Sequence, residues 1–351
     1  MIKMKNYKEN YLKAVKFEKP DFIPITFVIN HACWDYYDHS VLFDLMETHH
    51  RLFPGFKRPT GEYRPELPLV ARKDEPFRDD FGCLWKTTTN GITGTVVEHP
   101  LIDWDAFKNW KRPNPEVCMG IGPIDWIIER KDIEERRDKG ELISCGLRHG
   151  HTFLQLQDIR GYENLIYDFV DEVPNVHELI DIVESFNLAI IRRYLDIGVD
   201  VMTYPEDLGM QTGPMLTPEQ FRKYIKPSYQ RLMKPAREAG VIIHMHSDGD
   251  IRELIDDIIE GGVDIINLQD NVNGIDWIAK RFSGRTCVEL DIDRQQITVF
   301  GTPKEIDNHI ARIVKTIGSP QGGLMMIFGL YPGTPVGNIR ALMDAMEKYS
   351  G

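Results

Sequence analysis

Residues 241–250, which read VIIHMHSDGD, decide the fold prediction. The aliphatic start of this stretch is typical of a buried strand, and side chains alternate between the two faces of a strand. Val241, Ile243 and Met245 share one apolar face, whereas His244, His246 and Asp248 share the opposite face. A barrel strand turns its apolar face toward the surrounding helices and its other face toward the barrel axis. We therefore expect these three side chains to point into a barrel.

Six further segments resemble buried strands, at residues 23–29, 142–147, 199–204, 264–269, 286–292 and 323–329. Helix starts separate several of them, with Thr217 and Thr302 as N-caps, each followed by proline and then by Gln220 or Glu305. Alternating helices and strands imply parallel strands. The predicted fold is α/β, a distorted (β/α)8 TIM barrel with an N-terminal β-hairpin inserted at about 80–100, and residues 1–351 form a single domain. A doubly wound open sheet is the alternative.

The amino-acid composition argues against several classes of function. A formal charge of -12 over 351 residues argues against nucleic acid or an anionic membrane as partner, because both need a basic surface. No apolar window is long enough for a membrane span, and the start lacks the core of a signal peptide, so a cytoplasmic location is expected. Five scattered cysteines show no CxxC pair. The oligomeric state stays open, with a homodimer among the alternatives.

Other strands add polar groups to the predicted interior. Because side chains alternate along a strand, Asn267 and Gln269 are expected to point inward from one strand. The next strand is expected to point Glu289, Asp291 and Asp293 inward, and Glu206 and Asp207 follow the strand at 199–204. Burying several charges costs several kcal/mol each unless they are paired or bind metal, which favours a function. A metal-free hydrogen-bond network explains the residue types equally well. Helix capping is the stronger expectation for Asp207 and Asp250, and packing is the stronger one for Tyr331.

At these residues the chain resembles the uroporphyrinogen decarboxylase superfamily, which includes cobalamin-dependent methyltransferases. The similarity is most specific over 204–339. The segments that carry it are YPEDLGMQTGPMLTPEQF, HSDGDIRELIDD, ELDIDRQQITVFGTPKEI, GGLMM and PGTPVGNI. The resemblance implies a distorted TIM barrel with its site at the C-terminal mouth of the strands.

Two departures from the family pattern indicate which branch of the superfamily the chain resembles, the decarboxylases or the methyltransferases. The decarboxylases grip porphyrin carboxylates with an RQAGR motif, but the comparable region here reads FVINHACWDYYDHS and has no arginine. The methyltransferase relatives bind zinc through a His-x-Cys pair and a later cysteine. The histidine maps onto His246, Asp248 stands in place of the first cysteine, and no cysteine follows Cys287. A shell of nitrogen and oxygen ligands suits polarisation of an oxygen more than activation of a thiol.

The resemblance thus implies a methyltransferase of the O-demethylase type, which moves a methyl group from a methoxylated aromatic, a small-molecule donor, to the cobalt(I) of a separate corrinoid protein. Zinc is the expected cofactor. The predicted catalytic residues are His246, Glu206 and Asp207, and the predicted metal ligands are His246, Asp248, Asp291 and Glu289. The predicted substrate-binding residues are His244, Gln269, Asn267 and Tyr331. The alternatives are a metal-free decarboxylase or lyase that uses Asp207 or His246 as general acid on a small carboxylate, and a non-catalytic binding barrel.

Overall fold

The structure is a computed structural model that describes residues 4–351, and the chain divides into two compact units. The central unit consists of Asp74–Thr87 and Gly94–Ile266. The terminal unit contains the chain up to Lys73, the short segment Thr88–Thr93 and Asn267–Gly351. Seven strands make up the main sheet, and helices alternate with them along the chain.

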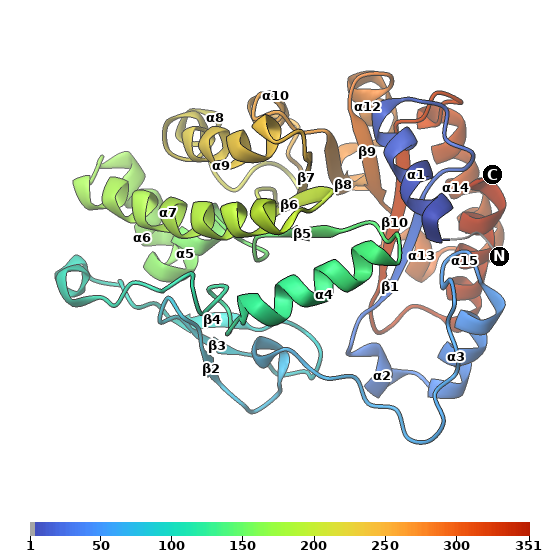
Figure 1. Ribbon diagram of the computed structural model, residues 1–351, viewed down its shortest axis with the longest axis horizontal. Coiled ribbons are helices and arrows are strands. Elements are labelled where there is room, and N and C mark those ends of the chain that lie inside the picture. Colours follow the sequence, from blue (N-terminus) through green and yellow to red (C-terminus); the bar gives the residue numbers. More distant parts are fainter. Residues whose placement is uncertain (1–3) are drawn as a thin grey trace. The chain divides into compact units, whose positions relative to one another are not determined.

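Three parallel strands of the main sheet belong to the central unit. They are β5 (Ser144–Gly146), β6 (Val201–Asp207) and β7 (Ile242–Asp248), in the order β7-β6-β5. The long helix α7 (Pro174–Ile197) lies beside α9 (Lys226–Glu238), and both contact these strands (Figure 1). The helix-facing side chains of β6 and β7 are buried, whereas every second residue toward the carboxyl ends of these two strands is partly accessible.

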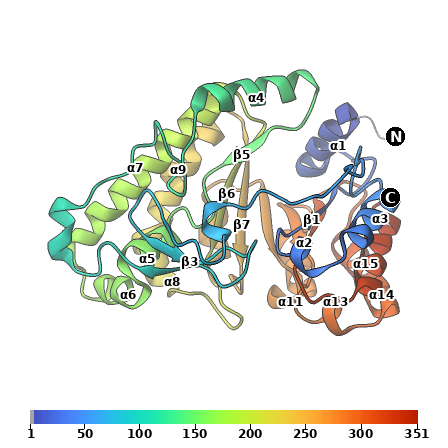
Figure 2. The ribbon, with the colours of Figure 1, turned by 90° about the horizontal axis from the view of Figure 1, so that it is seen from below.

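The terminal unit has a second set of parallel strands. It comprises β1 (Ile25–Ile29), β10 (Leu324–Leu330) and β9 (Cys287–Asp291), in the order β1-β10-β9. Helices α14 (Pro303–Ile317) and α15 (Val336–Tyr349) pack side by side, and α15 contacts β1 (Figure 2). Strand β8 (Ile265–Gln269) carries the chain from the central unit into the terminal unit.

The remaining helical segments are shorter or connect the strands. In the terminal unit they are α1 (Met4–Lys16), α2 (Cys33–Tyr36), α3 (His39–Thr48), η1 (Leu69–Ala71), α11 (Asp270–Asn273), α12 (Ile275–Phe282) and α13 (Ile297–Phe300). In the central unit they are η2 (Trp104–Asn109), α4 (Trp126–Asp138), α5 (Phe153–Arg160), α6 (Tyr162–Val170), α8 (Pro218–Gln220), the π-helical η3 (Phe221–Ile225) and α10 (Ile255–Ile259).

The architecture confirms the fold class predicted from the sequence, an α/β TIM-barrel-like fold, and each of the seven predicted strands is present. The described residues contain seven strands in the main sheet, one fewer than a complete (β/α)8 barrel. The predicted N-caps are also confirmed, because Thr217 and Thr302 each form a capping box with the residue three positions later. The helix that Asp250 was expected to cap begins later, at Ile255, with Leu254 at its N-cap, so the capping expectation for Asp250 is wrong.

The inserted hairpin is a small sheet of three antiparallel strands. Its strands are β2 (Phe77–Arg78), β3 (Leu84–Lys86) and β4 (Thr95–Glu98). A turn at Asn90-Gly91 lies in the connection between β3 and β4. A Cβ on Gly91 would overlap the backbone of Ala32, and its φ is +80°, so glycine is required there.

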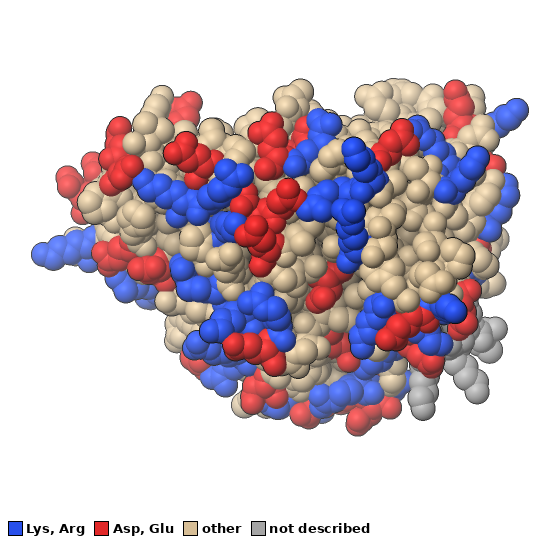
Figure 3. Space-filling model, turned by 90° about the horizontal axis from the view of Figure 1, so that it is seen from above, with Lys and Arg blue, Asp and Glu red and all other residues tan. Residues whose placement is uncertain are grey.

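No helix in residues 4–351 combines the length and apolar character needed to cross a bilayer. Acidic and basic side chains are interspersed on the face shown in Figure 3, with no extended patch of one sign. This face therefore lacks the basic stripe that binding to a phosphate backbone requires.

Candidate metal centre

Strand β7 shows the alternation that its sequence predicts. His244, His246 and Asp248 are partly accessible, while their neighbours in the strand are buried. In the register with β6, Thr203 pairs with His244, Pro205 with His246, and Asp207 with Asp248. Residues paired in parallel strands project to the same face of the sheet. Asp207 therefore shares the face of His246 and Asp248.

Three side chains at the carboxyl ends of β5, β6 and β7 form a donor cluster, which comprises His149, Asp207 and His246. Oδ1 of Asp207 lies 3.3 Å from Nε2 of His149 and 3.5 Å from Nε2 of His246. One potential ligand atom from each residue falls within 4.8 Å of the others. The His149 side chain is 52% exposed, so solvent or a ligand can reach the cluster from that side.

His149 enters this cluster because the chain beyond β5 continues along β6. The N–H of Leu147 donates to the carbonyl of Thr203 at 3.1 Å, and the N–H of Gly150 donates to that of Pro205 at 2.9 Å. A Cβ on Gly146 would overlap Thr203, so glycine permits this close approach. The sequence analysis missed His149. The signal was present in the letters RHGH, residues 148–151, directly after the strand predicted at 142–147.

The electrostatics of the cluster hold Asp207 ionised. Burial would raise the pKa of Asp207, but hydrogen bonds with His149 and His246 outweigh burial and lower it below its ordinary value. The backbone N–H of Asp248 also donates to Oδ1 of Asp207, at 3.0 Å. The expectation that Asp207 caps a helix is wrong, since the next helix, α8, is capped by Thr217. Asp207 is instead the acceptor at the centre of the cluster.

The donor cluster fits a zinc ion. Tetrahedral zinc with nitrogen and oxygen ligands at about 2.0–2.1 Å places neighbouring ligand atoms about 3.3 Å apart. The separations of 3.3 and 3.5 Å between Asp207 and the two histidines are close to this value, and the third separation, between the histidines, is at most 4.8 Å. Two imidazoles and one ionised carboxylate also match the ligand types that zinc accepts, and three protein ligands are typical of catalytic zinc sites.

Asp248, a predicted metal ligand, lies at the edge of the cluster. Its Oδ1 is 3.9 Å from Nε2 of His246, and its side chain is 35% exposed. His244, predicted to bind substrate, lies one pleat below His246 on the same face, opposite Thr203. The ligand role of Asp248 and the binding role of His244 stay predictions.

Glu206 projects to the opposite face of β6. It is fully buried, and its carboxylate accepts hydrogen bonds from the backbone of α5 and its N-cap and from the hydroxyl of Tyr229 in α9. Burial raises the pKa of Glu206 to about 7. The structure thus separates two adjacent acids that were both predicted to be catalytic. Asp207 faces the two histidines, and Glu206 faces the helices.

The remaining predicted site residues belong to the terminal unit. Nδ2 of Asn267 donates to Oε2 of Glu289 at 2.9 Å, and Asp291 lies 3.0 Å from Nη2 of Arg294. The Arg294 guanidinium in turn lies 5.6 Å from the ring centroid of Tyr331. Gln269 is buried at the end of β8. Their predicted roles as metal ligands and substrate contacts remain untested.

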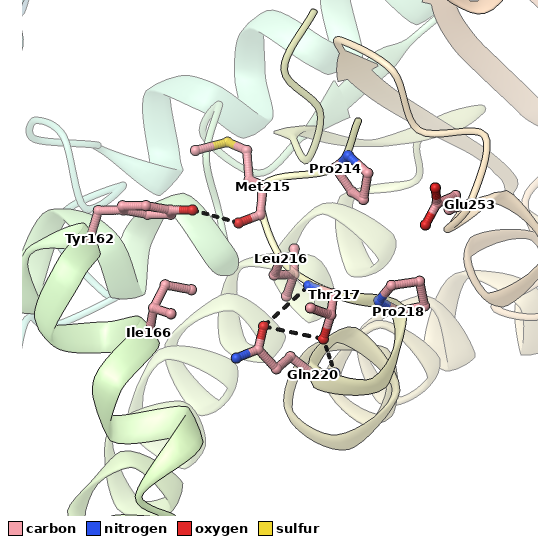
Figure 4. A pocket seen from close by; sticks show the side chains of 9 residues that line it. All are labelled: Tyr162, Ile166, Pro214, Met215, Leu216, Thr217, Pro218, Gln220 and Glu253. Atoms are coloured by element: carbon pink, nitrogen blue, oxygen red, sulfur yellow. Dashed lines mark hydrogen bonds between the residues drawn. The ribbon is translucent and has the colours of Figure 1, made fainter. Parts of the chain in front are cut away.

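A groove of about 330 Å³ lies elsewhere in the central unit (Figure 4). It is bounded by α6, by residues 214–220 and by Glu253, and the hydroxyl of Tyr162 donates to the carbonyl of Met215 at 2.7 Å across it. None of the three residues of the donor cluster lines this groove. The groove and the donor cluster are therefore distinct features of the central unit.

A barrel-like α/β fold with polar side chains at the carboxyl ends of its strands defines a large class of proteins, and comparisons with known proteins place the chain within it. The family model described as Uroporphyrinogen decarboxylase (URO-D) matches residues 80–349. The chain belongs to this family, which confirms the resemblance seen in the sequence.

Individual relatives are more distant. A uroporphyrinogen decarboxylase of Thermus thermophilus is 27% identical over 175 residues, which is 49% of this chain and 48% of the relative. That of Nocardia farcinica is 23% identical over 184 residues, again 49% and 48%. The matched region thus spans about half the length of these relatives. Among solved structures, a methyltransferase from Methanosarcina mazei has a similar fold, with a TM-score of 0.64, 14% identity, and coverage of 98% of this chain and 99% of that one.

Proposed function

We propose that the protein is a methyltransferase that takes a methyl group from an oxygen-linked donor and passes it to the cobalt(I) of a corrinoid protein. The observation that carries the proposal is the donor cluster of His149, Asp207 and His246, with its separations of 3.3 and 3.5 Å. Membership of the uroporphyrinogen decarboxylase family and a fold shared with a methyltransferase support the same assignment.

His149, Asp207 and His246 would hold zinc, and Asp248 is the next acid along β7 that could join them. Bound zinc would supply Lewis acidity, which makes an alkoxide or phenoxide a better leaving group. The chain's own residues prepare this site. The N–H of Asp248 orients the Asp207 carboxylate, and the carboxylate favours the orientation in which each imidazole turns Nε2 toward the cluster.

The ligand chemistry supports an oxygen-linked donor over a thiol substrate. Each donor atom of the cluster is nitrogen or oxygen, which makes the site harder than the thiolate shells that suit thiol activation. Cys145 lies in β5 of the same unit, but burial raises the pKa of its thiol to about 11. Cys145 is not one of the three residues of the donor cluster.

The methyl transfer has a simple balance. The O–CH3 bond breaks and its electron pair remains on the oxygen, while the electron pair of cobalt(I) forms the new bond to the methyl carbon. A methoxylated aromatic is the proposed donor, because a phenoxide is a stabilised leaving group. The half-exposed His149 leaves the cluster accessible to such a donor from one side.

The alternative is a metal-free decarboxylase or lyase with a side chain of the cluster as general acid. Burial would raise the pKa of Asp207, but hydrogen bonds from both histidines outweigh burial and lower it. This carboxyl therefore has no proton to donate near neutral pH. His246 would then have to be the acid. Metal content separates the two functions, since only the methyltransferase needs tightly held zinc.

The experiment combines metal analysis with two assays. Purified protein should contain one zinc per chain, and His246→Ala should lose it while remaining folded. The chain should demethylate a methoxylated aromatic only when a reduced corrinoid protein is present. A parallel assay with methylcobalamin and coenzyme M should give no product. Activity confined to that second assay, or full activity without metal, would contradict the proposal.

A further inference from the structure

Glu206 carries more contacts than its position beside Asp207 suggests, and all of them lie within the central unit. Its Oε2 accepts hydrogen bonds from the N–H groups of Thr152, at 3.0 Å, and Phe153, at 2.9 Å. Its Oε1 accepts from the N–H of Leu154 at 3.1 Å. The hydroxyl of Tyr229 donates a fourth bond, to Oε2, at 3.0 Å. One buried carboxylate thus binds three consecutive backbone amides.

These three amides begin helix α5. The first N–H groups of a helix have no partner within the helix, and a side chain at the N-cap usually accepts from one of them. Thr152 occupies the N-cap of α5, but its side chain makes no capping hydrogen bond. Glu206 takes over this role from a neighbouring strand, because its two carboxyl oxygens accept from all three N–H groups.

The other side of His149 is held as well. Nε of Arg148 donates to the carbonyl of His149 at 3.1 Å. The same guanidinium donates to Gln155 at 2.7 Å and to Asp158 at 3.1 Å, both within α5. Arg148 and Asp158 are both buried. The segment that carries His149 is therefore fixed by polar contacts before and after the histidine.

His149 depends on these contacts because its own side chain is 52% exposed. An exposed imidazole gains little from packing, so the backbone must set its position. We propose that Glu206 is a positioning residue: by fixing the start of α5, it holds His149 at hydrogen-bond distance from Asp207 and so prearranges the donor cluster. The two adjacent acids of β6 then have different roles. Asp207 is a donor of the cluster, and Glu206 supports a second donor, His149.

The test uses zinc alone as ligand and rests on the proposed function only in that choice. Glu206→Gln replaces one carboxylate oxygen by an NH2 group, which faces backbone donors in either orientation of the amide. We expect zinc affinity, measured by competition with a chelator, to fall about 10- to 100-fold, as is typical when a residue that supports a metal ligand is lost. Glu184→Gln is the matched control. Glu184 is a buried acid bound to Ser228 and Arg231 in the same unit, and this variant should retain the wild-type zinc affinity.

A double-mutant cycle separates positioning from general destabilisation. If Glu206 acts through His149, Glu206→Gln should weaken zinc binding in wild-type protein and have almost no further effect in His149→Ala. Equal effects in both backgrounds would overturn the proposal. Where Glu206→Gln does not fold, Glu206→Asp keeps the carboxyl group and withdraws its oxygens by one methylene, and it should show the same pattern to a smaller degree.

Crystal structures of the metal-free proteins provide a readout independent of zinc. Glu206→Gln should displace His149 from Asp207, while Glu184→Gln should leave their separation unchanged. If wild-type protein bound no zinc, the proposed function would lose its metal, but the position of His149 in these structures would still decide the role of Glu206. If His149 kept its position in Glu206→Gln, the positioning role of Glu206 would be refuted.

Discussion

Nε2 of His149 and Oδ1 of Asp207 lie 3.3 Å apart, although one residue follows β5 and the other ends β6. The carboxyl ends of neighbouring parallel strands meet at one edge of a sheet, and this edge is where barrels of this kind place their active sites. His246 joins the pair from β7. Three consecutive strands of the central unit thus contribute one donor each.

The first prediction concerns His149. His149→Ala should weaken zinc binding at least 100-fold, because it removes one of three donors from the cluster. The metal-free fold should survive with little change in the free energy of unfolding, since the side chain is half exposed. Chelator competition and urea unfolding measure the two quantities. His50→Ala, at an exposed histidine of the terminal unit, should change neither. Unaltered zinc affinity in His149→Ala would remove this residue from the site.

The second prediction ranks two acids on the same face of the sheet. Asp207→Asn should lower zinc affinity by at least tenfold more than Asp248→Asn does. The Asp207 carboxylate lies 3.5 Å from Nε2 of His246, compared with 3.9 Å for Asp248, and it also contacts His149. The asparagines preserve volume, so both variants should remain folded. The opposite order of affinities would make Asp248 the principal acidic ligand, as the sequence alone predicts.

The third prediction concerns the contribution of Asp79, in the small inserted sheet, to the stability of the fold. Asp79 is buried and accepts hydrogen bonds from the N–H groups of Phe81 and Cys83 and from Nε1 of Trp85. Asp79→Ala leaves these donors without their acceptor and should cost about 3 kcal/mol in the free energy of unfolding. Urea unfolding followed by tryptophan fluorescence measures the loss. The exposed Asp105 provides the control, because Asp105→Ala should change stability by less than about 0.5 kcal/mol.

The fourth prediction concerns pH and Asp158. Burial raises the pKa of Asp158 to about 7, although Arg148 opposes the shift. Between about pH 4 and pH 7 the unfolded chain therefore loses this proton while the folded chain retains it, so Asp158 makes the folded state less stable as pH rises through that window. Asp158→Asn has no carboxyl to titrate. Its free energy of unfolding should decline less between pH 4 and pH 7 than that of the wild type.

The comparison in this fourth experiment is between slopes, since Asp158→Asn also changes the hydrogen bond from Arg148 and so shifts the free energy of unfolding at every pH. Circular dichroism during urea titrations at several pH values gives each slope. Parallel curves for variant and wild type would show that Asp158 does not titrate in this range.

The sequence by itself determined the strands and the face that each presents. Alternation in residues 241–248 depends only on the two-residue period of a strand, and the structure shows the predicted pattern of exposure around His244, His246 and Asp248. Capping by Thr217 and Thr302 was equally local, because a capping box is formed by residues three apart. The family could likewise be recognised from motifs along the chain, which the match to residues 80–349 confirms.

The tertiary structure alone decided which of the polar residues meet. Glu206 and Asp207 are adjacent in sequence, but the strand turns one toward α5 and α9 and the other toward the histidines. The two acids could not be separated from the sequence, because the predicted strand ended at Tyr204 and neither acid was assigned to a face. The structure continues β6 through Asp207.

His149 shows the same limit more clearly. It stands in an irregular segment after a short strand, where no periodicity assigns a direction to a side chain. Its place beside Asp207 comes from the contact of Gly146 with Thr203 and from the bonds that Glu206 makes to the start of α5. A metal site depends on the distances between atoms from separate strands, and those distances are fixed by packing and long-range hydrogen bonds, which local sequence patterns do not encode.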